Sequence, residues 1–400
     1  MKAIASESPS YGAGLLLLAV ALLGIGMVTV TSATAPLDHS MLDVPPWKSV
    51  YGRQLVFAFL GIIALVAGWR FFPFVLDRPA LRRALPKVAL ATAITLLVLV
   101  LIPGFAEARR GSQRWLHVGP SWLGLGFQPS ELTKIAMVLA MASLLGDRAT
   151  DMRKFWRGFV PPLSVMGICV GLVGKEDFGT AMILACTGAI LLIGAGCRWA
   201  HLGIAGSLGV VGMVGLLIAE PYRIERLTAS SNIWDNVRGN DYQPVQSLTT
   251  IASGSWWGTG LGAGVQKHGY IPEGHTDFIF SVICEETGVL GGMMVMGLYA
   301  AFLWIGLRIV LNAPTAYERL LAMGITAYVT VQALLNIAVV TVVTPTTGVS
   351  LPLVSAGGSG VIMICASIGV LAALGQRGAG NAVSTPEVAG DSEREALLSP

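Results

Sequence analysis

The strongest constraint on this chain is a stretch from Leu320 to Gln376 that contains no charged residue. As a single helix it would extend about 85 Å at 1.5 Å per residue, whereas the hydrocarbon core of a bilayer is ~30 Å thick. Pro345, with Gly348 and Pro352 close behind it, interrupts the helix. The stretch therefore predicts two membrane-spanning helices joined by a break.

The composition excludes the soluble classes of protein. Of the 400 residues, 54% are hydrophobic and 12% are charged, against ~25% charged in a typical soluble domain. So little charge cannot cover a soluble surface, which excludes a cytosolic enzyme and a nucleic-acid binder. The five cysteines form no CxxC pair, which excludes a thiolate metal site and a disulfide framework.

A spanning helix needs ~20 mostly apolar residues. We predict ten such helices, at 12–32, 52–71, 88–103, 130–146, 158–174, 178–197, 199–218, 278–307, 318–343 and 350–375. Ser32 to Ala35 resemble a signal-peptide cleavage site, but no charge occurs between Glu7 and Asp38. That run is longer than the ~7–15 apolar residues of a signal peptide, so we favour an uncleaved first span.

The predicted fold is an all-α polytopic membrane protein of one ten-helix domain, residues 1–376. More than half of the 26 Lys and Arg residues fall on the inner side when both termini are cytoplasmic. Residues 377–400 are polar and rich in small residues, which predicts a flexible cytoplasmic tail. The outer loops are 104–129 and 219–276, and the second lies between helices 7 and 8. Its apolar, glycine-rich part, 251–264, predicts a re-entrant or surface-lying segment.

Ionisable residues beside membrane helices are candidate functional residues, and they gather on the outer side. Arg109, Arg110 and Arg114 share one outer loop. Guanidinium groups bind phosphate oxygens bidentately, so these arginines can hold an anion such as a lipid pyrophosphate. Alternatively they contact lipid headgroups and pair with Glu107. The residues alone leave both interpretations open.

A second group begins the fourth predicted helix. Pro129 and Ser130 are typical helix-starting residues, and Glu131 and Lys134 are spaced to share one helix face. They form either a structural ion pair or the lining of a polar cavity. A third group, 175–180, is a short charged turn, for which a solvated tip is the favoured interpretation.

A fourth group surrounds the start of the eighth helix. Thr276 is a plausible N-cap, which places Asp277 in the first turn. Glu285 would then lie roughly 12 Å deeper and about 80° around the helix, so both carboxylates can face one cavity. Glu286 points to the opposite face. A capping role for Asp277 is the alternative to a functional one.

At these residues the sequence resembles the SEDS family (shape, elongation, division, sporulation), which contains FtsW, RodA and SpoVE. The resemblance covers about residues 50–375, and its motifs occur in the family's order. They are Gly111–Trp115, Gln128–Lys134, Tyr242-Gln243 with Gln246-Ser247, Gly258–Gly264, Pro272–Phe280, Glu285–Gly288, Pro345–Gly348 and Ser355–Ser359. Lys175-Glu176 and Ala356 depart from the family pattern. The residues 345–348 and 265–267 resemble the division branch, so we expect an FtsW-like member.

The resemblance implies a membrane glycosyltransferase that polymerises lipid II, an undecaprenyl-pyrophosphate disaccharide-pentapeptide, on the outer face of the cytoplasmic membrane. Asp277 becomes the expected catalytic general base, with Glu131, Lys134 and Glu285 as cavity support. Substrate contacts are expected from Arg109, Arg110, Arg114, Arg223, Arg226, His275, Gln243, Ser355 and Ser359.

The expected partner is a class B penicillin-binding protein, together with other division or elongation membrane proteins, and no nucleic acid. No cofactor is obligatory, although a divalent cation such as Mg or Mn can assist the leaving pyrophosphate. Two other functions remain open, a lipid II flippase and a non-catalytic scaffold. The concentration of acids at the outer ends of the spans favours chemistry there over transport.

Overall fold

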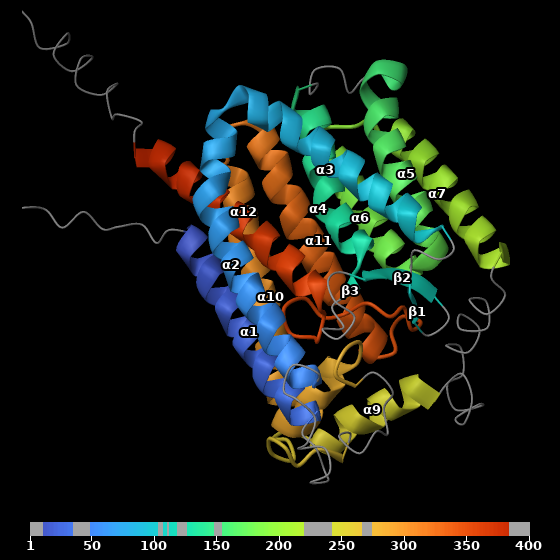
Figure 1. Cartoon of the computed structure of the whole chain (residues 1–400), viewed down its shortest axis with the longest axis vertical. Coiled ribbons are helices and arrows are strands. Elements are labelled where there is room, and N and C mark those ends of the chain that lie inside the picture. Colours follow the sequence, from blue (N-terminus) through green and yellow to red (C-terminus); the bar gives the residue numbers. More distant parts are fainter. Residues whose placement is uncertain are drawn as a thin grey trace, which may run out of the picture.

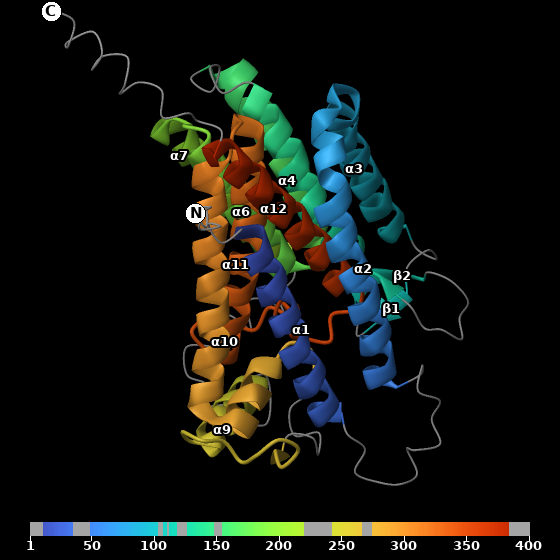
Figure 2. The ribbon, with the colours of Figure 1, turned by 90° about the vertical axis from the view of Figure 1, so that its left-hand side faces the viewer.

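The computed structural model describes residues 11–34, 49–102, 107–109, 112–117, 126–147, 154–219, 242–265 and 274–383. Long helices lie side by side, and α9 crosses the end of the molecule where the α1 and α10 helices meet the glycine-rich segment (Figures 1 and 2). The elements, in chain order, are α1 (Tyr11–Thr34), α2 (Val50–Asp77), α3 (Pro79–Val100), β1 (Glu107–Arg109), β2 (Ser112–His117), β3 (Gly126–Phe127), α4 (Pro129–Asp147), the π-helical turn η5 (Phe155–Phe159), α5 (Val160–Glu176), α6 (Phe178–Gly194), α7 (Trp199–Ala219), α9 (Tyr242–Gly254), α10 (Ile279–Asn312), α11 (Ala316–Val340) and α12 (Ser359–Val383).

A helix occupies each of the ten predicted spanning segments. Within the described part of the chain, seven helical segments are long and apolar enough to cross a membrane by length and composition. The α6 and α7 helices are apolar but shorter by the same measure. The α4 helix carries Glu131, Lys134 and Asp147, which lower its hydropathy. The structure therefore supports a multi-pass membrane protein.

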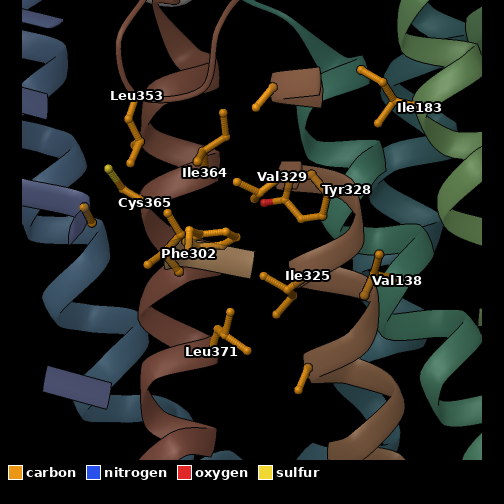
Figure 3. Packing of buried hydrophobic residues seen from close by; sticks show 14 of the residues in the cluster. Val138, Ile183, Phe302, Ile325, Tyr328, Val329, Leu353, Ile364, Cys365 and Leu371 are labelled. Atoms are coloured by element: carbon orange, nitrogen blue, oxygen red, sulfur yellow. The ribbon is translucent and has the colours of Figure 1, made fainter. Parts of the chain in front are cut away.

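The α11 helix lies at the centre of the hydrophobic core (Figure 3). Its buried side chains Ile325, Tyr328 and Val329 pack among residues from four neighbouring helices. These residues are Val138 of α4, Ile183 of α6, Phe302 of α10, and Ile364, Cys365 and Leu371 of α12. Because α11 is surrounded, a polar side chain on it must find its partner inside the protein.

The segment 104–129, predicted as a loop, contains a small antiparallel sheet in the order β1-β2-β3 within an otherwise helical fold. Strand β2 contacts the ends of α3, α4 and α5 (Figure 1). A Cβ at Gly126 would lie 2.8 Å from the indole ring of Trp115, so glycine allows β2 and β3 to pack this closely. The sequence did not predict this sheet, because its strands are short and show no clear alternation of polar and apolar residues.

Two predicted helix boundaries are wrong. The last span was expected at 350–375, but residues 341–358 form a non-helical loop and α12 begins at Ser359. The tail was expected from residue 377, yet α12 continues to Val383. The guanidinium of Arg377 lies 2.6 Å from the carboxylate of Asp77 in α2, which holds this end of α12 in place. Residues 384–400 lie outside the described part.

The α10 segment is not one continuous helix, contrary to the predicted span at 278–307. Gly288 has φ 74° and ψ 179°, a non-helical conformation. In a straight helix, residues 280 and 292 would be about 18 Å apart. Here a Cβ at Gly292 would lie 3.4 Å from the ring of Phe280 and 2.7 Å from the sulfur of Cys284. The residues before Gly288 therefore fold back against those that follow it.

Because the helix is interrupted at Gly288, backbone groups near it lose their helical hydrogen bonds. The segment 255–260 provides hydrogen-bond partners for them. The amides of Thr259 and Gly260 donate to the carbonyls of Glu285 and Glu286 at 2.9 and 3.0 Å. In return, the amide of Val289 donates to the carbonyl of Ser255 at 2.9 Å. Buried backbone groups in a membrane protein need such partners. The glycine-rich segment is thus a clamp on the turn of α10.

Candidate functional site

A polar cavity lies where the N-terminal ends of α4 and α6 meet α11 and the 341–358 loop. It is small, with a volume of about 40 Å³. Its lining residues are almost all polar: Gln128, Glu131, Lys134, Asp177, Thr180, Gln332, Gly348, Val349 and Ser350. We refer to this as the polar cavity. Because isolated polar groups are costly among membrane helices, so many of them around one space indicate a functional site.

Lys134 is the buried cation of the polar cavity, with 2% of its surface exposed. Its ammonium group lies 2.8 Å from the carboxylate of Glu131 and donates at 2.6 Å to the amide oxygen of Gln332. The amide nitrogen of Gln332 donates to the carbonyl of Ser350 at 3.0 Å. The sequence spacing predicted the pair of Glu131 and Lys134, and the structure places it in the cavity lining.

Asp277 lies in the turn that precedes α10, and its carboxylate is next to the polar cavity. A Cβ at Gly348, a lining residue, would stand 3.6 Å from its Oδ2. The side-chain amide of Asn336 donates to the carbonyls of Asp277 and Val349, both at 2.7 Å. Asn336 therefore holds the Asp277 turn against the 341–358 loop. Nothing in the sequence distinguished Asn336 as a site residue within its apolar helix.

Ser355 and Ser359 were expected to bind substrate, and the structure gives both hydroxyls protein partners. The hydroxyl of Ser355 donates to the carbonyl of Thr276 at 2.6 Å and accepts from the amide of Leu351 at 2.8 Å. The hydroxyl of Ser359 accepts from the amide of Gln128 at 3.1 Å. The two serines therefore position the chain on either side of the cavity.

Asp177 is one of the site residues that sequence reasoning missed, since a solvated tip was favoured for 175–180. It is 4% exposed and caps α6 by accepting from the amide of Thr180 at 3.0 Å. Its carboxylate is also 3.6 Å from the guanidinium of Arg114 and 3.5 Å from the amide of Gln128. The Asp-Phe-Gly-Thr order already contained an N-cap signal, with the cap residue two positions before Gly179.

Glu285 follows Asp277 along the short helix that begins at Ile279, with Phe278 rather than Thr276 as the N-cap, but it does not share the cavity of Asp277 as predicted. It is 1% exposed, and its carboxylate accepts from the amide of Val265 at 2.8 Å. Glu286 accepts from the hydroxyl of Ser32 in α1 at 2.5 Å. Glu286 also accepts from the amide of Gly262 at 3.2 Å. The two carboxylates therefore contact α1 and the residues that follow the clamp segment, and neither lines the polar cavity.

The remaining predicted residues fall outside the cavity lining or outside the described residues. Gln243 lies in the first turn of α9 and is half-buried. The carbonyl of His275 accepts from the amide of Ala356 at 3.1 Å, so the family departure at 356 preserves a backbone contact. Arg109 ends β1, and its side chain is not described. Arg110, Arg223 and Arg226 lie outside the described residues.

A divalent cation needs several oxygen, nitrogen or sulfur ligands close together. Within the described ranges, no three His, Cys, Asp or Glu residues cluster in a way that could hold a metal ion. Glu131 is already neutralised by Lys134. The described residues therefore do not form a resident metal site, and no reaction step is derived through one.

Comparison with known proteins identifies the family. The family model for cell cycle proteins of the FtsW, RodA and SpoVE group matches residues 13–378. Stage V sporulation protein E of Bacillus subtilis (strain 168) is 37% identical over 89% of this chain and 94% of its own length. A probable peptidoglycan glycosyltransferase FtsW of Thioalkalivibrio sulfidiphilus is 37% identical over 90% of this chain and 88% of its own length.

Solved structures share the fold. One, described as the structural coordination of polymerization and crosslinking by a peptidoglycan synthase complex, aligns with a TM-score of 0.72 at 26% identity. It covers 92% of this chain and 98% of its own chain. The rod shape determining protein RodA of Thermus thermophilus aligns with a TM-score of 0.61 at 26% identity, covering 91% of this chain and 96% of its own.

The fold and the site together define a multi-pass membrane protein with an ionisable cavity between its helices. The chain belongs to the SEDS family of FtsW, RodA and SpoVE proteins. The expectation of an FtsW-like member is confirmed by these relatives.

Proposed function

We propose that this protein is a membrane peptidoglycan glycosyltransferase that polymerises lipid II for cell-wall synthesis. The observation that carries the proposal is the polar cavity, which has the carboxylate of Asp277 next to it and the buried ion pair of Glu131 and Lys134 in its lining. Relatives named as probable peptidoglycan glycosyltransferases cover about nine-tenths of the chain, at 90% for the two FtsW proteins of Thioalkalivibrio and Trichlorobacter.

In the proposed reaction, Asp277 accepts the proton of an acceptor sugar hydroxyl. The hydroxyl oxygen forms a bond to the anomeric carbon of the donor, and the bond from that carbon to the pyrophosphate oxygen breaks. The lipid pyrophosphate leaves with the bonding electrons, and its negative charge needs nearby cations. Lys134 and Arg114 are the described cations around the cavity. Asp177 would orient Arg114 by their 3.6 Å contact.

The packing below the polar cavity favours a site that opens at one end over a transport path. One turn along α11 from Gln332 stands Tyr328, whose ring centroid lies 6.0 Å from the ammonium of Lys134. Beyond it, Ile325 packs with Phe302 and Leu371 in the hydrophobic core (Figure 3). A flippase would instead need polar groups that continue through this layer.

We also propose the finer placement of the protein. The ten helices would all cross the cytoplasmic membrane, with both termini cytoplasmic and the polar cavity at the outer face. Residues 251–264 would lie at the outer surface or re-enter it. Because one similar structure is a complex that joins polymerization to crosslinking, a class B penicillin-binding protein is the proposed partner, alongside other division or elongation proteins.

The test of function uses purified protein with its penicillin-binding partner and labelled lipid II in detergent. Glycan polymer is expected from the wild type and from Asp77→Asn, an acid that is 63% exposed in a pair with Arg377. Asp277→Asn should remain folded and form no polymer. Transfer of lipid II between liposome leaflets without polymer would indicate a flippase, and neither activity would indicate a scaffold. Wild-type rates from Asp277→Asn would remove Asp277 as the general base.

A further inference from the structure

A basic hairpin, formed by the end of α2 and the start of α3, lies at the end of the molecule away from the β-strands (Figure 2). Asp77 ends α2 and Pro79 begins α3, so a single residue, Arg78, joins two long helices. Between residues 70 and 87 the chain carries five basic residues and one acid. The basic residues are Arg70, Arg78, Arg82, Arg83 and Lys87. The function proposed above does not use this hairpin.

The inward side of the basic hairpin is held to the rest of the protein. The carboxylate of Asp77, the acid of the hairpin, lies 2.6 Å from the guanidinium of Arg377 in α12. The guanidinium of Arg82 lies 4.7 Å from the ring centroid of Tyr317 in α11. The hairpin is therefore fixed against two other helices, and its acid is already neutralised by a cation from outside it.

The outward side of the basic hairpin carries the other four cations. Arg70, Arg83 and Lys87 are exposed, and among the described residues none of them forms an ion pair. The guanidinium of Arg78 lies 3.9 Å from the ring centroid of Phe74, one turn earlier in the chain. Arg83 and Lys87 are also one turn apart, so they share a face of α3. Each of the two helices therefore presents a short row of cations outward.

Apolar side chains lie beside these cations on the same outward side. Phe71 and Phe74 of α2 are 67% and 50% exposed, and Val88 of α3 is 61% exposed. Of the seven described segments that are long and apolar enough to span a membrane, α2 and α3 are the least buried, at 22% each against 67% for α11. Exposed apolar side chains on such helices contact lipid. The hairpin therefore presents cations at the helix ends and apolar side chains directly next to them.

We propose that the basic hairpin is a selective binding site for an anionic phospholipid. Its phosphate contacts the outward cations, because guanidinium groups bind phosphate oxygens bidentately and an ammonium group adds a compact charge. Its acyl chains lie along Phe71 and Val88. An acidic protein segment would match the charge of the hairpin, but only a molecule that is apolar below its headgroup also matches the side chains beside it. The proposal does not depend on the proposed function.

The test compares two double variants of the purified protein in detergent. Arg83→Gln with Lys87→Gln removes two cations of the hairpin, and Arg308→Gln with Arg319→Gln removes two exposed cations where α10 and α11 meet. Native mass spectrometry measures the apparent Kd for phosphatidylglycerol and for zwitterionic phosphatidylcholine. A basic residue near an anionic surface contributes about fivefold in affinity, so the hairpin variant should bind phosphatidylglycerol about 25-fold more weakly than the wild type. The control variant should keep the wild-type Kd, and the wild type should prefer phosphatidylglycerol to phosphatidylcholine by about tenfold or more.

Four results would overturn the lipid site. The first three are an unchanged Kd in the hairpin variant, an equal loss of affinity in the control variant, and equal affinity of the wild type for the two phospholipids. The fourth uses inorganic phosphate, which has no acyl chain, as a competitor. If it displaces phosphatidylglycerol as well as a short-chain phosphatidylglycerol does, the hairpin binds a soluble anion and not a lipid.

A photo-crosslink to the wild-type protein keeps the test valid if the hairpin variant does not fold. Phosphatidylglycerol with a diazirine in its acyl chain, close to the glycerol, is bound to the protein and illuminated. Peptide mapping should find the adducts concentrated in residues 70–88, and an excess of unlabelled phosphatidylglycerol should remove them. Adducts spread evenly over the exposed helices, or concentrated at another site, would show that the hairpin does not select this lipid.

Discussion

Lys134 shows at the scale of one residue why a buried charge needs its partners. Its ammonium is 2% exposed and contacts both Glu131 and Gln332, which are drawn from helices far apart in the chain. Removal of one member of a buried ion pair leaves the other as an uncompensated charge. The pair therefore has both a structural role and a proposed role in the reaction, and the two can be separated by mutation.

Lys134→Met should destabilise the protein by about 3–5 kcal/mol, because Glu131 would stay buried without its cation. Glu131→Gln combined with Lys134→Met should recover most of that stability, since no charge remains. Polymerisation should be lost in both. Thermal unfolding in detergent and the lipid II assay measure the two properties separately.

The matched control is Asp77→Asn, which breaks an exposed pair and should cost about 1 kcal/mol or less. If the double variant is as unstable as Lys134→Met, the unpaired charge of Glu131 is not the cause of the lost stability. An active double variant would show that the pair has only a structural role.

At the scale of elements, the turn of α10 at Gly288 places Asp277. The nine residues from Ile279 to Thr287 form a short helix that begins just after Asp277 and ends at the clamp segment. Asn336 holds the first end, and the backbone pairs of 255–260 hold the second. Movement of this short helix would therefore move the Asp277 carboxylate relative to the polar cavity.

Gly288→Ala should destabilise this turn strongly. Its φ of 74° and ψ of 179° lie in a region that is essentially restricted to glycine, at a cost of about 1–3 kcal/mol for other residues. In addition, a Cβ there would stand 2.2 Å from the carbonyl of Trp256. We expect a lower unfolding temperature and a lower kcat.

Gly297→Ala is the control in the same helix, where a Cβ would meet nothing within 4 Å. It should leave activity unchanged and stabilise the helix by at most about 1 kcal/mol. Equal effects of the two substitutions would show that helix propensity, and not the turn, governs stability at Gly288.

At the scale of the whole molecule, the described charges separate toward opposite ends. Arg377 pairs with Asp77 at one end, where the guanidinium of Arg82 also lies 4.7 Å from the ring centroid of Tyr317. The polar cavity, with Lys134, lies toward the other end of the helices. Basic residues concentrate on the cytoplasmic side of membrane proteins, which supports the proposal that the cavity faces outward.

This orientation predicts the labelling of two introduced cysteines in a Cys186→Ser background, which removes the exposed native cysteine. Lys175 and Arg83 are both exposed, and the proposed orientation places Lys175 on the outer side and Arg83 on the inner side. A membrane-impermeant maleimide should label Lys175→Cys in intact spheroplasts and Arg83→Cys only after permeabilisation. The opposite pattern would reverse the orientation, and the unmodified background protein controls for the four buried native cysteines.

The sequence alone predicted the features that depend on neighbouring residues. Runs of apolar residues predicted the positions of ten helices, and a helix is present in each of them. Pro345 with Gly348 predicted the break between α11 and α12. The pair of Glu131 and Lys134 also follows from local spacing, because residues three apart share a helix face. The ordered motifs predicted the family, which the comparisons confirmed.

Only the tertiary structure decided which distant residues share the site. Lys134 and Gln332 are separated by 198 positions, and no periodicity connects them. Gln332, Asn336 and Asp177 are single polar residues among apolar neighbours or at a turn, and their partners were unknown before the helices packed. The reversal at Gly288 was also hidden, since a single glycine inside a helical pattern does not by itself end the helix. Helical periodicity is a property of one segment, whereas the polar cavity exists only between segments.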